Sequence, residues 1–307
     1  MAALKLGTRG SKLALTQAGL VRDALARSVP ALAASDAIEI VVIKTTGDAI
    51  QDRPLLEAAG KGLFTKELDT ALLEGEIDLA VHSAKDLPTV LPNGLVIAGY
   101  LPREDVRDAF ISLRARTFAD LPERAVVGSA SLRRQAQVKR LRPDLQVSLL
   151  RGNVGTRLAK LERGEFHATL LAMAGLNRLG LTDHVTAIFD IDDFLPAVGQ
   201  GAIALVARKI DTRTLEAVGS IVDAATGAAL VAERAYLAVL EGSCRTPIAG
   251  HARLTEDRLA FRGLVLRPDG SQSLSAAGEG PAADAERIGR AAGQDLRARL
   301  PPGFLSV

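Results

Sequence analysis

Residues 77–81, Ile-Asp-Leu-Ala-Val, form a short apolar run that leads directly into a polar loop, His-Ser-Ala-Lys-Asp-Leu-Pro, at residues 82–88. The arrangement recurs along the first two thirds of the chain, where further apolar runs end in polar or glycine-containing loops at residues 38–45, 125–127, 147–150 and 168–173. Short apolar runs bounded by turn-forming residues are typical of buried β-strands. We therefore expect a series of short strands, each followed by a loop.

Helical patterns lie between these strands. In residues 66–74 the apolar side chains fall on one helix face, and Gly75 follows as a stop signal. Residues 157–163 are a second expected helix, with Thr156 as its N-cap and Gly164 as its stop. Strands that alternate with helices predict an α/β fold with mostly parallel sheets that are covered on both faces.

In such sheets, ligands bind at the carboxyl ends of the strands, in the loops that lead to the next helices. Asp86 lies in the polar loop quoted above, although an aspartate there could also be an ordinary cap or ion-pair partner. Ser129 and Ser131 precede the helix that carries Arg133 and Arg134. Because the free N–H groups and the dipole of a helix start favour an anion, this loop is a candidate anion site.

Charge is unevenly distributed along the chain. The whole sequence has a formal net charge of only +2, yet residues 133–163 carry a net charge of +7, and Arg151 and Arg157 bracket a second helix start there. Arginine forks suit carboxylates or phosphates, so the stretch indicates an anionic ligand. Nucleic acid is disfavoured because the stretch has no aromatic residue for stacking bases. A solvated helix face remains the alternative for Arg140, Arg142 and Arg163.

Composition excludes several classes of protein. With 307 residues, 48% of them hydrophobic, the chain is long and apolar enough for two or three domains, so intrinsic disorder is excluded. A single cysteine, Cys244, excludes a disulfide-stabilised fold. Four scattered histidines show no metal-ligand spacing, and Gly60-Lys61-Gly62 is too weak a match to a nucleotide-binding motif. Because no long apolar segment occurs, we expect a soluble, cytoplasmic protein.

After about residue 222 the pattern changes. One helix is expected over residues 226–241, followed by the loop Gly242-Ser243-Cys244-Arg245-Thr246-Pro247. Alternating strands and a last helix then predict a small α+β domain, with strands near 248–254, 259–266 and 271–277 and the helix over 283–300. The thiol of Cys244 beside Arg245 is a candidate reactive group because a cation lowers a thiol pKa, although free cysteines are also often buried structural residues.

Eight motifs occur in order along the chain: Arg9-Gly10-Ser11, Gly60-Lys61-Gly62-Leu63-Phe64, Val81-His82-Ser83-Ala84-Lys85-Asp86-Leu87-Pro88, Arg103-Glu104-Asp105, Ser131-Leu132-Arg133-Arg134-Gln135, Leu150-Arg151-Gly152-Asn153-Val154-Gly155-Thr156-Arg157, Leu195-Pro196-Ala197-Val198-Gly199-Gln200-Gly201 and Gly242-Ser243-Cys244. As a set, they resemble the porphobilinogen deaminases, also called hydroxymethylbilane synthases. Any one motif could arise by chance, whereas the set in this order is highly specific.

The resemblance implies an architecture. Two α/β lobes similar to those of type II periplasmic binding proteins are expected, with the chain crossing between them twice. The first lobe would comprise residues 1–101 and 200–219, and the second residues 105–196. An α+β domain over residues 222–307 would carry the cofactor cysteine.

The resemblance also implies a reaction. Enzymes of this family join four porphobilinogen molecules head to tail, release ammonia at each addition and free the linear tetrapyrrole hydroxymethylbilane by hydrolysis. The product grows on a dipyrromethane cofactor that is bound through a thioether to the cysteine matching Cys244. Each porphobilinogen unit carries an acetate and a propionate, so each addition brings two negative charges that arginines can bind.

Roles for individual residues follow from the same match. Asp86 corresponds to the catalytic aspartate, which would stabilise a cationic pyrrole and assist proton movement. Expected cofactor ligands, besides Cys244, are Lys85, Ser83, Ser129, Ser131, Arg133, Arg134, Arg151, Gly152 and Arg157. Expected substrate ligands are Arg9, Ser11, Arg151, Arg157, Lys61, Phe64 and Gln200, with Lys61 and Phe64 in a loop that resembles a mobile lid.

One alternative belongs to a different class of function. A non-catalytic two-lobed protein could bind a small anion with the same arginines. Such a protein needs neither Asp86 nor Cys244 and would more often carry an export signal, which the sequence lacks. We therefore expect a monomeric enzyme that acts on porphobilinogen, with no metal, no nucleic-acid partner and no membrane partner.

Overall fold

The computed structural model describes residues 3–49, 62–242 and 246–305. The chain divides into two compact units, Met1–Glu104 with Gly201–Gly227 and Asp105–Gln200 with Ala228–Val307. Within these described ranges, the first unit contains one sheet and the second contains two.

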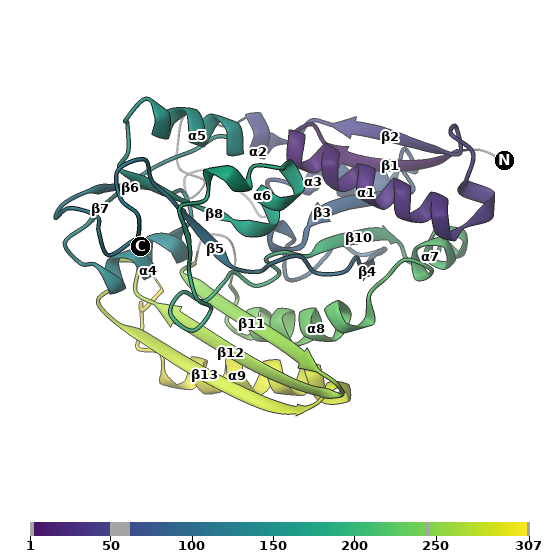
Figure 1. The fold of residues 1–307 in the computed structure, drawn as a ribbon. Coiled ribbons are helices and arrows are strands. Elements are labelled where there is room, and N and C mark those ends of the chain that lie inside the picture. Colours follow the sequence, from purple (N-terminus) through teal and green to yellow (C-terminus); the bar gives the residue numbers. More distant parts are fainter. Residues whose placement is uncertain (1–2, 50–61, 243–245, 306–307) are drawn as a thin grey trace. The chain divides into compact units, whose positions relative to one another are not determined.

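The first unit is built around a five-stranded sheet with the order β2-β1-β3-β10-β4 (Figure 1). Its strands are β1 Leu4–Arg9, β2 Ile38–Ile43, β3 Leu79–Ser83, β4 Leu95–Tyr100 and β10 Ile203–Arg208. β1 pairs in parallel with β2 and β3, whereas β10 runs antiparallel to β3 and β4. A strand from late in the sequence therefore completes the sheet that the first hundred residues begin.

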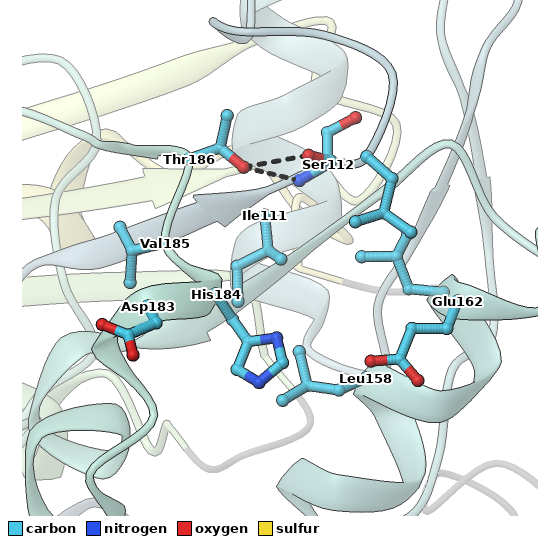
Figure 2. A pocket seen from close by; sticks show the side chains of 10 residues that line it. Ile111, Ser112, Leu158, Glu162, Asp183, His184, Val185 and Thr186 are labelled. Carbon is cyan, nitrogen blue, oxygen red and sulfur yellow. Dashed lines mark hydrogen bonds between the residues drawn. The ribbon is translucent and has the colours of Figure 1, made fainter.

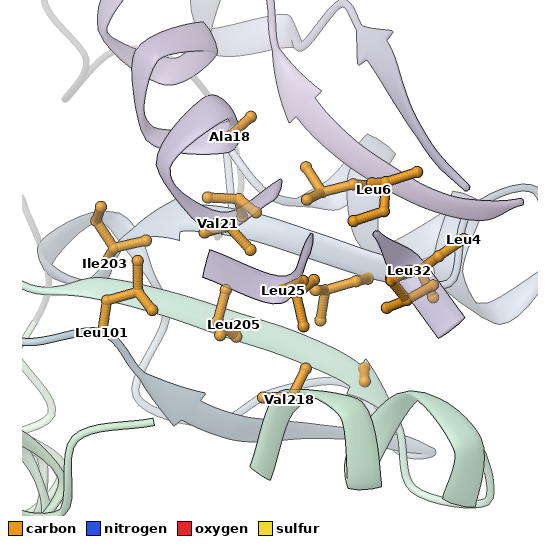
Figure 3. Packing of buried hydrophobic residues seen from close by; sticks show 14 residues of the cluster. Leu4, Leu6, Ala18, Val21, Leu25, Leu32, Leu101, Ile203, Leu205 and Val218 are labelled. Carbon is orange, nitrogen blue, oxygen red and sulfur yellow. The ribbon is translucent and has the colours of Figure 1, made fainter. Parts of the chain in front are cut away.

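Helices cover this sheet. They are α1 Lys12–Ser28, α2 Thr46–Ala49, α3 Lys66–Leu73 and α7 Thr212–Gly219, with short 3-10 helices at Pro30–Leu32 and Ala84–Asp86. Val21 and Leu25 of α1 lie one helical turn apart and pack against Leu6 of β1 and Leu205 of β10 (Figure 3). Val218 of α7 joins the same cluster. Every residue of β10 except the last is buried, so both faces of this strand are covered.

The second unit contains a five-stranded sheet with the order β7-β6-β8-β5-β9. Its strands are β5 Asp108–Ile111, β6 Val126–Gly128, β7 Gln146–Ser148, β8 Ala168–Ala172 and β9 Ala187–Ile188. β6 pairs in parallel with β7 and β8, whereas β5 runs antiparallel to β8 and β9. The sheet thus repeats the pattern of the first one, in which the fourth strand opposes its neighbours.

Four helical segments accompany this sheet: α4 Leu132–Leu141, α5 Val154–Glu162, α6 Met173–Leu179 and a 3-10 helix at Thr182–His184. Its core includes a group of phenylalanine rings in edge-to-face and stacked contacts, formed by Phe110, Phe118, Phe189 and Phe194. Strand β5 and the segment near Phe194 are therefore packed together.

The last part of the chain has a three-stranded antiparallel sheet in the order β11-β12-β13. Its elements are α8 Ala224–Val239, β11 Ile248–Thr255, β12 Arg258–Leu266, β13 Ser273–Pro281, a 3-10 helix at Ala282–Asp284 and α9 Ala285–Arg299. Tyr236 of α8 is fully buried over this sheet, and a Cβ at Gly263 would lie 2.6 Å from its ring. Glycine is therefore required where the ring meets β12.

These elements confirm the predicted fold class, two α/β lobes with a small α+β part at the C-terminal end. The strand expected at residues 77–81 is observed two residues later, at Leu79–Ser83. The expected cap of the second helix is wrong: α5 begins at Val154, and the Asn153 side chain accepts a hydrogen bond from the Thr156 N–H at 2.9 Å. Thr156 therefore lies inside the first turn.

Among the described residues, no single helix is long and apolar enough to cross a membrane. Helices α7 and α8, bent by 113° at the break between them, pass that test of length and composition only when taken together.

Candidate active site

Arg9 is the last residue of β1, so its side chain starts at the carboxyl end of this strand. Its Nε donates a hydrogen bond to Oδ2 of Asp48 at 3.0 Å, and its Nη2 donates another to Oδ1. Its Nη1 lies 3.7 Å from Oδ2 of Asp86. The guanidinium also lies over the Phe64 ring, 4.2 Å from the ring centroid. One arginine thus joins two carboxylates and an aromatic ring.

The Arg9–Asp48 pair stays charged. Burial opposes the charged form of Arg9, but the hydrogen bond to Asp48 and the charges of Asp86 and Asp48 raise its pKa overall. Burial likewise acts to raise the pKa of Asp48, but hydrogen bonds from Arg9 and Thr45 hold it below its ordinary value. Thr45 Oγ1 donates to Asp48 Oδ2 at 2.8 Å, so the carboxylate has a second fixed partner.

Asp86 ends the short 3-10 helix Ala84–Asp86, which follows β3 directly. The backbone on either side is held, because Ala84 N donates to Ala202 O at 3.0 Å and Leu87 N donates to Ala84 O at 3.3 Å. The Asp86 carboxylate remains partly exposed. It is therefore an anchored carboxylate, accessible to a ligand, beside a permanently charged arginine.

Two residues near Asp86 and Arg9 have hydrogen bonds that fix local structure. Ser83 Oγ lies 3.0 Å from Nε2 of the buried Gln17 in α1. Ser11, an expected substrate ligand, is the N-cap of α1 and accepts a hydrogen bond from Ala14 N at 3.2 Å. Lys85 is half-buried between Ser83 and Asp86 in the chain.

His82 is a buried neighbour of the site that the sequence did not assign. Burial first, and the charge of Arg9 second, lower its pKa to about 4, so the ring is neutral near pH 7. Its Nε2 has no hydrogen-bond partner among the residues that the structure describes. The group contributes no charge to the site under ordinary conditions.

In the second unit, Arg133 and Arg134 share one carboxylate. Arg133 Nη2 lies 2.8 Å from Oδ2 of Asp108, and Arg134 Nε and Nη2 donate to Oδ1 at 2.9 and 2.6 Å. Asp108 is fully buried, and the two arginines are only 4% and 6% exposed. Burial acts to raise the pKa of Asp108, but the two positive charges lower it overall, so the carboxylate stays ionised.

The start of α4 is fixed by both predicted serines. Ser131 is the N-cap, and its Oγ accepts a hydrogen bond from Arg134 N at 3.4 Å. Ser129 Oγ accepts from Ser131 N at 3.2 Å, and Gln135 Nε2 donates to Ser129 O at 2.9 Å. The predicted placement of these serines at the amino end of the arginine-bearing helix is therefore observed.

The start of α5 is shaped by a glycine. Gly152 has a φ of +113°, and a Cβ there would lie 2.7 Å from Cγ2 of Thr156. Both the backbone conformation and the lack of space therefore disfavour any residue other than glycine. Arg157 Nε donates to Gly152 O at 2.9 Å. Arg151, half-buried, directly precedes the glycine. These three predicted ligands thus form one local group.

Of the remaining predicted residues, Gln200 and Phe64 are described by the structure, and Lys61 and Cys244 are not. Gln200 Nε2 donates to Val106 O at 2.7 Å, which joins the segments where the chain enters and leaves the second unit. Phe64, from the predicted lid, packs beneath Arg9.

Asp48 and Asp108 are the acidic residues that the sequence prediction omitted. The Thr46-Gly47-Asp48 loop after a predicted strand was a signal for the first. An aspartate that opens the apolar run Asp108–Ile111 was a signal for the second, since a buried carboxylate requires a partner.

A separate pocket of about 180 Å³ lies in the second unit and contains none of these residues (Figure 2). Its walls include Leu158, Glu162, Asp183 and His184, and Thr186 Oγ1 donates to Ser112 O at 3.0 Å beside it. Among the described residues, no group of three or more histidine, cysteine or acidic side chains could hold a metal ion.

Comparison with known families decides what this site belongs to. Residues 4–216 match the model described as porphobilinogen deaminase, dipyromethane cofactor binding domain, and residues 228–298 match the porphobilinogen deaminase C-terminal domain. The chain belongs to the porphobilinogen deaminase family. The predicted resemblance is therefore confirmed.

Curated relatives extend over nearly the whole chain. A porphobilinogen deaminase of Nitrobacter hamburgensis is 58% identical over 302 residues, which cover 98% of this chain and 95% of the relative. One of Paracoccus denitrificans is 54% identical over 301 residues, with 98% and 96% covered.

Solved structures similar to part of the chain include two binding proteins. One is a putative methionine-binding lipoprotein of Bacillus subtilis, with a TM-score of 0.43 at 12% identity, covering 72% of this chain and 90% of that one. A nutrient-binding protein of Burkholderia cenocepacia bound to methionine has a TM-score of 0.44 at 13% identity, with 71% and 90% covered. The fold assignment rests on the observed sheets rather than on these similarities.

Proposed function

We propose that this chain joins four porphobilinogen molecules head to tail, releases ammonia at each addition and frees hydroxymethylbilane by hydrolysis. The observation that carries the proposal is the match to both porphobilinogen deaminase family models, which together span most of the chain. The reaction belongs to tetrapyrrole biosynthesis.

The described residues fit a cofactor rich in carboxylates. Two buried guanidiniums share the single carboxylate of Asp108, which leaves a formal surplus of one positive charge. Arg133 Nε is buried and has no hydrogen-bond partner within the part of the chain that the structure describes. A buried surplus charge favours binding of an anion. When bound through Cys244, the dipyrromethane supplies the pyrrole on which the product grows.

In the proposed mechanism, Arg9 and Asp86 act on the incoming substrate. The Asp86 carboxylate stabilises the positive charge that develops on the substrate pyrrole as ammonia leaves, and it assists movement of the pyrrole protons. Arg9 binds a substrate carboxylate, and its contacts with Asp48 and Phe64 support this role by fixing the guanidinium before substrate arrives.

The other roles extend this division. We assign cofactor carboxylates to Arg133 and Arg134, and further cofactor contacts to Ser83, Lys85, Ser129, Ser131 and Gly152. Arg151 and Arg157 would serve both cofactor and substrate. Ser11, Lys61, Phe64 and Gln200 would complete the substrate site.

We further propose three domains, made of residues 1–101 with 200–219, 105–196 and 222–307. The return of β10 to the first sheet and the separate β11-β12-β13 sheet support this division. Placement in the cytoplasm is supported by the presence of only one cysteine. The monomeric state and the absence of nucleic-acid and membrane partners stay predictions, which light scattering and binding assays would check.

Intact mass under denaturing conditions tests the proposal. The chain purified from cells that make porphobilinogen should exceed its sequence mass by two pyrrole units, and Cys244→Ser should lack this addition. Asp86→Asn should keep the addition but lose turnover by about 100-fold or more, because the carboxylate charge is gone. A wild-type chain at its bare sequence mass, or normal turnover by Asp86→Asn, would contradict the assignment.

A further inference from the structure

The cluster of Asp108, Arg133 and Arg134 contains a residue that the proposed function does not yet use. Asp108 opens β5, is fully buried and contacts both arginines, which are adjacent in α4. A carboxylate buried this deeply cannot itself meet a ligand from solvent. Its contribution must therefore act through the two side chains that it holds.

The two arginines are held differently. Arg133 divides its Nη atoms between Asp108 Oδ2 and the backbone carbonyl of Leu195, to which Nη1 donates at 2.7 Å. Arg134 turns Nε and Nη2 toward Asp108 Oδ1, and among the described residues no hydrogen-bond partner is found for its Nη1. The Asp108 contacts thus leave one edge of Arg134 available.

Charge and location point the same way. With one carboxylate between two guanidiniums, the cluster keeps a formal surplus of one positive charge. Arg134 lies in the first turn of α4, where free backbone N–H groups add positive potential. Ser129, which is buried, and Ser131 fix this turn through their hydroxyl groups. The serines therefore fix the backbone that carries Arg134, and Asp108 fixes its guanidinium through Nε and Nη2.

We propose that Asp108 is a positioning residue that orients Arg134, and with it Arg133, to receive carboxylates of the dipyrromethane. This inference rests on the proposed function, because the cofactor supplies the carboxylates. A guanidinium displaced by about 1 Å would lose bidentate geometry, and misplacement on this scale can cost about 100-fold in function.

The test compares two substitutions of Asp108, one that removes the negative charge and one that moves it. Asp108→Asn keeps the shape but removes the charge, and Asp108→Glu keeps the charge but moves the carboxylate. Asp144→Asn is the matched control, since Asp144 pairs with Arg142 at the surface of the same unit. All four proteins are produced in cells that make porphobilinogen and measured by intact mass, thermal unfolding, KM and kcat.

We expect both Asp108 variants to unfold cooperatively. In the intact-mass measurement, the ratio of modified chain, which carries the two-pyrrole addition, to unmodified chain should be about ten-fold or more below that of wild type. Their modified fraction should turn over with a raised KM and a smaller change in kcat. Asp144→Asn should match wild type in all four measurements. If Asp108→Glu keeps the thermal transition of wild type but still has a low modified fraction, the position of the carboxylate matters and its charge alone does not suffice.

Two results would overturn the inference. A folded Asp108→Asn or Asp108→Glu protein with the wild-type modified fraction and KM would show that Asp108 does not orient the arginines. Failure of both variants to fold would give the carboxylate a structural role only. If wild type itself carried no adduct, the proposed function would fail instead, so the two failures are distinguishable.

Discussion

At the scale of single residues, the existing partners of an arginine decide how it can bind a ligand carboxylate. Arg9 already has Asp48 as a close partner through Nε and Nη2, so a substrate carboxylate would share the guanidinium with Asp48. Arg134 keeps an edge without a partner among the described residues, because Asp108 occupies only two of its nitrogens. We therefore expect Arg134 to bind a carboxylate without first breaking an ion pair.

His82 provides a pH test at this scale. Its pKa in the folded chain is about 4, against about 6.5 when unfolded, so the unfolded chain takes up the proton first as pH falls. The free energy of unfolding should therefore decrease between about pH 6.5 and pH 4, by about 3 kcal/mol from this residue. Urea unfolding of wild type and His82→Gln from pH 4 to pH 7 measures it.

The wild-type advantage over His82→Gln should shrink as the solution becomes more acidic. A difference in unfolding free energy that stays constant across this pH range would show that His82 is not held neutral by the fold.

The sequence predicted where several candidate site residues lie, namely in loops after strands. Asp86, Ser131 and Gly152 were placed correctly at element ends because apolar runs and turn residues mark those ends locally. Asp48 and Asp108 were missed because their importance comes from contacts with Arg9 and Arg134, which lie far away in sequence. Local patterns carry no information about such partners.

At the scale of elements, α5 shows how a cap is chosen. Asn153 has an extended backbone, with φ −73° and ψ 177°, and its side chain reaches Thr156 N. Thr156 was the predicted cap because it also has a suitable hydroxyl, but that hydroxyl instead lies 3.0 Å from Asn153 Oδ1. Backbone conformation, which the residue types alone do not reveal, decides between the two.

We expect Asn153→Ala to lower the free energy of unfolding by about 1 kcal/mol, the usual effect of losing an N-cap. Thr156→Val is the matched comparison, since it keeps the backbone N–H that donates a hydrogen bond to the Asn153 side chain. It should lower the free energy of unfolding by less. Denaturant unfolding of both variants measures the ranking. A larger loss in Thr156→Val would mean that the threonine, not the asparagine, stabilises the helix start.

At the scale of the whole molecule, each five-stranded sheet has three parallel strands and then a fourth that runs against its neighbours. The α/β class and the separate C-terminal sheet could be predicted from the spacing of apolar runs. The places of β5 and β10 could not be found that way, because antiparallel pairing with β8 and β3 joins segments distant in sequence. For β10, only the family resemblance predicted the return.

The central claim is that this chain carries out the complete porphobilinogen deaminase reaction. The most direct measurement is the stoichiometry of purified wild-type protein, with porphobilinogen consumed, ammonia released and hydroxymethylbilane formed all followed in one reaction. The account predicts four porphobilinogen consumed and four ammonia released for each hydroxymethylbilane. The account would be contradicted if protein that carries the two-pyrrole addition consumed no porphobilinogen, or if it released a product of different length.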